Sequence, residues 1–69
     1  MNEQLRETLQ LRLDILREEM ALYPAELQMD PKQLLRETME ENLAIAKVDG
    51  NHKEIEQFQL ALLLIDGLE

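Results

Sequence analysis

The stretch that decides the fold is residues 55–65, IEQFQLALLLI. It is apolar on nearly every face, and it holds the only phenylalanine of the chain. Ile55, Phe58, Leu62 and Ile65 recur at spacings of three and four, as the residues of one helical face do. Leu, Ala, Gln and Glu favour helices, so the stretch is read as a helix rather than a strand. A helix that is apolar all round is buried on several sides, so this one needs neighbours.

The residues that flank this stretch mark the ends of the helix. Asn51 stands where an N-cap belongs, and Glu54 three residues later completes the pattern of a capping box. Gly67 follows the last apolar position, where a left-handed glycine commonly ends a helix. The sequence therefore predicts a helix over about 51–66.

A second helix is predicted over 31–48. Asp30 is its N-cap, and Pro31 occupies the first helical position, where its missing N–H has no consequence. The predicted inner face comprises Leu35, Met39, Asn42 and Ala46. Gly50 can take the left-handed conformation after this helix, so the link to the next helix is very short. A link of this length predicts that the helices 31–48 and 51–66 form an antiparallel hairpin.

The first helix is predicted over 2–22, with Asn2 as its cap and Pro24 just beyond its end. Its apolar residues form two stripes. The main stripe is Leu5, Leu9, Leu13, Leu16 and Met20, and a second stripe, well rotated from it, is Leu11, Ile15 and Leu22. One stripe docks on one neighbour, so two stripes predict two neighbours. In the connector, residues 24–27 are compatible with one helical turn, and Leu27 and Met29 are expected to cover the end of the core.

The composition is that of one small folded domain, residues 1–69. The hydrophobic fraction of 45% is too high for a disordered tail, despite a net charge of −8. There is no cysteine, so neither a disulfide nor a thiolate metal site can staple the fold. Domains this short rarely gain more than ~3–5 kcal/mol from a single core, and they often associate. The expected fold is all-α, with three helices assembled into a homo-oligomeric helical bundle, a dimer being favoured.

Location and partners are limited by the same composition. The longest fully apolar run, residues 60–65, is far shorter than the ~20 residues that a membrane span needs. The first residues contain no continuous apolar region of a secretory signal, so a cytoplasmic protein is expected. The acidic balance, with a pI of about 4.5, argues against direct binding to nucleic acid or to anionic membranes.

Catalytic and metal-binding patterns are weak. The chain has no Cys or Ser, so nucleophilic catalysis lacks a candidate. The only histidine, His52, lies near Asp49 and Glu56, but zinc and di-iron sites need more ligands than this. A calcium loop beginning at Asp49 fails because Leu60 stands where a bidentate Glu is required. We therefore expect no enzyme activity, no cofactor and no metal site.

The sequence has more apolar helix surface than three helices hide easily. The candidate interface residues are Leu11, Ile15, Leu22, Leu60, Leu63 and Leu64. The alternative is that the three helices wrap one another and bury both stripes. We favour the interface because small unstapled domains bury too little surface alone.

Two functions are compatible with such an interface. The first is a small acidic interaction module, that is, an adaptor, assembly factor or regulator that binds a target protein by burying helix faces. The second is an inhibitor, of the kind that phages and antitoxin systems encode, which masks a basic or nucleic-acid-binding site on its target. An inhibitor of this type associates by electrostatic attraction, so its binding weakens with salt.

Overall fold

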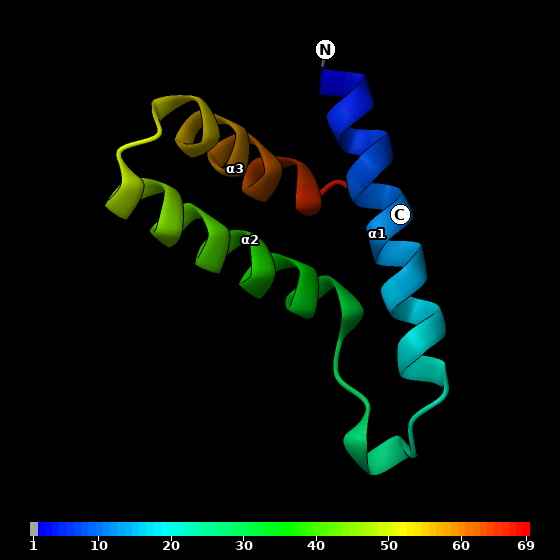
Figure 1. The fold of residues 1–69 in the computed structure, drawn as a ribbon. Coiled ribbons are helices and arrows are strands. Elements are labelled where there is room, and N and C mark those ends of the chain that lie inside the picture. Colours follow the sequence, from blue (N-terminus) through cyan, green and yellow to red (C-terminus); the bar gives the residue numbers. More distant parts are fainter. Residues whose placement is uncertain (1) are drawn as a thin grey trace.

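The computed structural model describes residues 2–69, with side chains from residue 3 onward, and these residues form three α-helices and no strand. The helices are α1 (Asn2–Ala21), α2 (Pro31–Asp49) and α3 (His52–Ile65), and one 3-10 turn, η1 (Ala25–Leu27), lies between α1 and α2 (Figure 1). The predicted all-α class is confirmed, and each helix ends within two residues of its predicted bounds. The expected cap by Asn2 lies outside the described side chains.

The turn between α2 and α3 is only two residues long. Gly50 has a φ of 69°, in the left-handed region that favours glycine. Its N–H donates to the Lys47 carbonyl (3.2 Å), and the N–H of Asn51 donates to the Ala46 carbonyl (3.0 Å). These are the two hydrogen bonds of a Schellman ending. The Asn51 side chain then accepts from the N–H of Glu54 (3.2 Å), so α3 begins at once and runs beside α2 (Figure 1).

The end of α3 differs from the prediction. Asp66 remains in the right-handed region, with φ −63° and ψ −25°, and among residues 2–69 only Gly50 has a positive φ. The prediction of a left-handed Gly67 is therefore wrong. The chain tightens instead, since Gly67 donates to Leu64 (3.0 Å) and Leu68 donates to Ile65 (3.1 Å). This turn directs Leu68 into the core, where only 5% of the residue is exposed.

One apolar core joins the three helices. Its buried members come from α1, α2, α3 and the segment after α3, and they are Leu9, Leu13, Leu35, Met39, Ala61, Ile65 and Leu68. The main stripe of α1 faces this core, as predicted. On α2 the predicted inner face is buried apart from Asn42, which is half-buried. Leu27 and Met29 do not cover the core: both are exposed, because η1 carries the connector away from it (Figure 1).

The helix α1 crosses the open end of the α2–α3 pair (Figure 1). The Cα atoms extend over 40 × 26 × 15 Å, so the molecule is elongated. The radius of gyration is 13.1 Å, against about 11 Å for a compact domain of this length. The chain alone therefore leaves much of its surface uncovered. No helix within residues 2–69 is long and apolar enough to cross a bilayer.

Candidate interaction surface

The face of α1 that points away from the core is apolar. Leu11 is 61% exposed, Ile15 is 46% exposed, and Leu22, directly after the helix, is 86% exposed. At ~100° per residue, these three positions fall within about 40° of one another and opposite the buried Leu13. We call Leu11, Ile15 and Leu22 the outer stripe of α1. The helix thus has one face in the core and, on the opposite face, three exposed apolar residues among polar ones.

The other predicted interface residues lie on α3 and differ among themselves. Leu63 is 75% exposed. Leu60 and Leu64 are half-buried, and Leu64 packs against the core. The six candidate residues therefore do not form one equivalent set: the outer stripe and Leu63 are uncovered, whereas the chain itself covers part of Leu60 and Leu64.

A further exposed face on α2 was not among the predicted interface residues. Val48 is 86% exposed, and Ile45, one turn earlier, is also exposed. Glu37 and Glu41 are exposed as well, and helical spacing places them on the same side of α2 as Val48. We call Glu37, Glu41, Ile45 and Val48 the outer face of α2. The sequence did contain a signal for this face, because Ile45 and Val48 are apolar residues three positions apart that lie outside the inner face of the helix.

A hollow of about 380 Å³ lies between α1 and α2. It is lined by Arg12, Ile15, Leu16, Leu35 and Thr38. The Thr38 hydroxyl donates to the Leu34 carbonyl of its own helix (3.0 Å). Arg12 is the only charged residue in the lining. Ile15 belongs both to this hollow and to the outer stripe of α1, so the two features form one continuous apolar surface.

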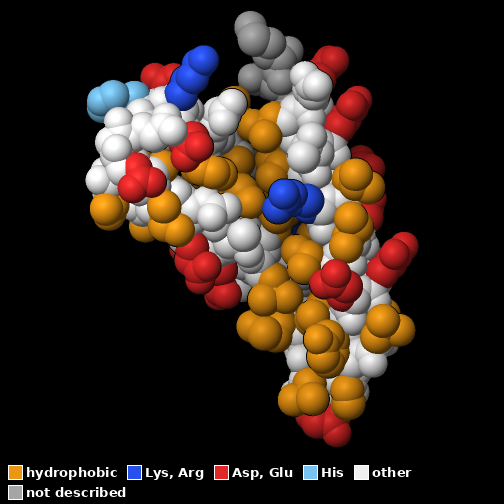
Figure 2. Space-filling model, viewed as in Figure 1, with side chains coloured by type: hydrophobic (Ala, Val, Ile, Leu, Met, Phe, Trp, Pro, Cys, Tyr) orange, Lys and Arg blue, Asp and Glu red, His pale blue; other side chains and the backbone are white. Residues whose placement is uncertain are grey.

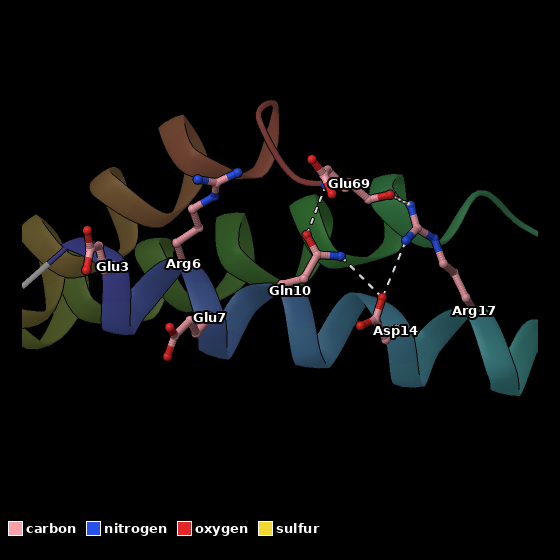
Figure 3. Close-up of a pocket in the computed structure, with 7 residues that line it drawn as sticks. All are labelled: Glu3, Arg6, Glu7, Gln10, Asp14, Arg17 and Glu69. Carbon is pink, nitrogen blue, oxygen red and sulfur yellow. Dashed lines mark hydrogen bonds and ion pairs between the residues drawn. The ribbon is translucent and has the colours of Figure 1, made fainter.

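A larger hollow, of about 610 Å³, follows α1 beneath the end of the chain (Figure 3). Glu69 donates its N–H to the Gln10 side chain (2.9 Å), and Arg17 donates to the Glu69 main-chain oxygen (2.7 Å). Gln10 in turn donates to Asp14 (3.2 Å), as the dashed lines in Figure 3 show. The central polar groups of this hollow are therefore engaged with one another and hold the last residues against α1.

The helix α2 holds the same terminal segment, residues 66–69, from the other side. Lys32 donates to the Leu68 carbonyl (2.8 Å), and Arg36 forms an ion pair with Asp66. Arg36 is half-buried in this position. The partners are at least 30 residues apart in the chain, so no local pattern could have revealed these contacts.

The candidate catalytic and metal-binding residues do not gather. His52, Asp49 and Glu56 are all exposed. Within residues 2–69, no group of three or more His, Cys, Asp or Glu is placed to hold a metal ion. The Thr8 hydroxyl donates to the Gln4 carbonyl of its own helix (3.0 Å).

Acidic groups dominate the charged surface, as the red side chains of Figure 2 show. The part of the chain that the structure describes contains two ion pairs, Arg17 with Asp14 and Arg36 with Asp66. The carboxylates of the outer face of α2 belong to neither pair. This face therefore combines exposed apolar side chains with carboxylates that no cation of the described chain neutralises.

Comparisons with protein-family models, with curated proteins and with solved structures each found no match to this chain.

Proposed function

We propose that this chain is a small acidic protein–protein interaction module, an adaptor, assembly factor or regulator that acts by burying helix faces against a target protein. The observation that carries this proposal is the exposure of large apolar side chains on all three helices, for example Ile15, Val48 and Leu63. Contiguous apolar surface that is rimmed by polar residues is typical of interaction sites. We propose no catalytic role for the chain. We propose a cytoplasmic location from the composition alone.

The outer face of α2 is the surface that we assign to the target. The pair α2–α3 acts as an antiparallel hairpin that presents this face on a rigid support. Ile45 and Val48 supply apolar contact area, and Glu37 and Glu41 supply negative charge beside it. Such a face fits a target patch that is apolar at its centre and carries Lys or Arg at its rim. Burial of the apolar groups then supplies affinity, and the charges supply orientation and association rate.

The test is affinity purification from the organism that encodes the chain, with three baits compared. The baits are the wild type, Val48→Glu on the outer face of α2, and Ile15→Glu on α1 as a matched control with the same added charge. We expect a protein that the wild type and Ile15→Glu retain and that Val48→Glu loses. Equal recovery of every protein by all three baits would contradict the assignment.

A second candidate is an inhibitor that masks a basic site on its target. The net charge of −8 favours it, together with the exposed Glu37, Glu40 and Glu41 of α2. An association dominated by charge falls steeply as salt rises from about 50 to 500 mM, because the screening length shrinks from over 10 Å to a few ångströms. Capture that survives high salt but is lost in Val48→Glu selects the interaction module, and capture lost with salt selects the inhibitor.

A further inference from the structure

The solvent-accessible surface of the chain is larger than that of a compact monomer of the same mass, which points to a partner that covers part of it. The accessible surface is 5249 Å². A folded monomer of 8.1 kDa is expected to expose about 4,500 Å², so the surplus is about 750 Å². Each partner in a standard-size protein interface contributes about 800 Å². The surplus is thus similar in size to the area that one partner contributes to an interface of ordinary size.

The outer stripe of α1 has the spacing of a helix–helix seam. The positions on this side of the helix alternate in steps of four and three, and they are Gln4, Thr8, Leu11, Ile15, Glu18 and Leu22. This alternation is that of the a and d positions of two packed helices. With a rise of 1.5 Å per residue, the outer stripe extends over about 16 Å. A second helix with the same stripe would cover it.

The charges beside the stripe are complementary when two copies run in opposite directions. Arg12 and Glu19 are both exposed and lie seven residues apart on the same flank of the stripe. Antiparallel copies bring Arg12 of each chain near Glu19 of the other, which gives two attractive pairs. Parallel copies would bring Asp14 near Glu19, which repel, and Glu7 near Arg12, which attract, so the parallel arrangement has no net gain from these flanking charges. The flanking charges therefore select the antiparallel arrangement.

We infer that a second copy of this chain covers the outer stripe of α1, with the two α1 helices antiparallel about a two-fold axis. Leu11 of each copy lies opposite Leu22 of the other, and Ile15 of each copy lies opposite Glu18 of the other, close to the axis. The hollow beside Ile15, bounded by Arg12, Leu16 and Thr38, receives apolar side chains of the second copy. This inference rests on the proposed function, since it names the partner of one surface, and it leaves the outer face of α2 free for the target.

The first experiment is sedimentation velocity of the full chain between about 5 and 500 µM, a range in which an interface of this size is measurable. The wild type is expected to sediment as a dimer. Ile15→Glu is expected to weaken the dimer at least about 100-fold, because it removes apolar contacts near the axis and places two more carboxylates beside the two Glu18 side chains. Val48→Glu adds the same charge outside the seam and is expected to stay dimeric. Far-UV circular dichroism checks that both variants keep their helices.

A charge exchange tests the orientation with residues whose substitution leaves the core untouched. Arg12→Glu and Glu19→Arg are each expected to weaken the dimer about tenfold, and the double variant is expected to restore wild-type association. A parallel dimer predicts the opposite sign for Glu19→Arg, because this change removes the repulsion from Asp14. A stronger dimer in Glu19→Arg would overturn the antiparallel arrangement.

The absence of cysteine in the sequence allows a direct check of the pairing. A disulfide requires Cα atoms about 4.4–6.8 Å apart, so it reports which positions face each other. On mild oxidation, Leu11→Cys is expected to cross-link with Leu22→Cys in a mixture and not with itself. Self-linking of Leu11→Cys without linking in the mixture would contradict the proposed register.

The inference and the proposed function fail in different ways. A wild type that stays monomeric up to about 500 µM, or an equal effect of Ile15→Glu and Val48→Glu on the dimer, overturns the inference. Target capture that depends on Val48 would survive either result, because it concerns the outer face of α2. Conversely, a dimer that Ile15→Glu disrupts stands even where no protein is captured.

Discussion

The pair α2–α3 and the helix α1 are built from similar residues, yet the chain completes only the first of them. The pair is joined by a two-residue turn whose backbone donors are satisfied by Lys47 and Ala46. The helix α1 reaches the pair through residues 22–30, all of which are exposed, and only Leu9 and Leu13 of α1 are fully buried. Both α1 and α2 expose apolar side chains together with several carboxylates.

The difference shows that α1 depends on residues outside itself for its position. Leu68 fills the space between α1 and the pair, and Gln10 and Arg17 of α1 bind the main chain of Glu69. The segment 66–69 therefore holds α1 against the α2–α3 pair.

The largest expected effect is at the contact of α1 with the core. Leu13 has no exposed surface, so Leu13→Ala removes buried contacts and leaves a cavity. The expected loss is about 2–5 kcal/mol, comparable to the whole stability of so small a domain. Urea unfolding followed by circular dichroism measures it. Leu11→Ala on the outer stripe is the control under monomeric conditions, and an equal loss there would mean that α1 has no distinct core face.

Removing the Leu68 side chain separates the two regions. Leu68→Ala is expected to lose about 2–3 kcal/mol, because it deletes a buried apolar group that joins α1 to the pair. Hydrogen exchange locates the effect: amides of α1 should lose protection before those of α2 and α3. Uniform loss of protection across all three helices would show that the chain unfolds as one unit, without a difference in stability between α1 and the α2–α3 pair.

The α2–α3 turn should respond to its glycine. Gly50→Ala is expected to lose about 1–2 kcal/mol, because an L-residue at this positive φ is strained. A Cβ at this position meets nothing within 4 Å, so the loss comes from the backbone conformation alone. Gly67→Ala is the matched control, since Gly67 has no positive φ, and it should be tolerated. Thermal melting of both variants decides this, and a larger loss at Gly67 would contradict the described turn.

The smallest effect is expected at the ion pair that links α2 to the terminal segment. Arg36→Gln removes the pair with Asp66, whose side chain is 71% exposed, so the loss should be below about 1 kcal/mol. High salt should produce a similar loss in the wild type and little in the variant. A loss of several kcal/mol in urea unfolding would show that the pair, rather than Leu68, closes the fold.

Local patterns in the sequence were sufficient for the helices and the turn. Asp30 and Asn51 cap α2 and α3 as predicted, and Gly50 takes the predicted left-handed conformation. Each of these features depends on residues within about one helical turn of one another, so the chain itself contains the whole signal.

Contacts between distant residues could not be predicted in this way. Leu68 follows a glycine, outside any helical repeat, and its burial depends on the position of α1, almost 60 residues away in the chain. The same holds for Arg36 and Lys32, whose partners lie in the terminal segment. The second stripe of α1 was visible in the sequence, but its exposure depends on how the three helices are arranged in space.

The dependence of thermal stability on chain concentration tests most directly whether the apolar face of α1 requires a second copy. A partner that binds only the folded state raises the melting temperature as its concentration rises. The melting temperature of the wild type should therefore increase over about a hundredfold range of chain concentration, and the transition should become more cooperative. The melting temperature of Ile15→Glu should stay constant over the same range. A wild type whose melting temperature stays the same at every chain concentration would show that the monomer is stable without a second copy on α1.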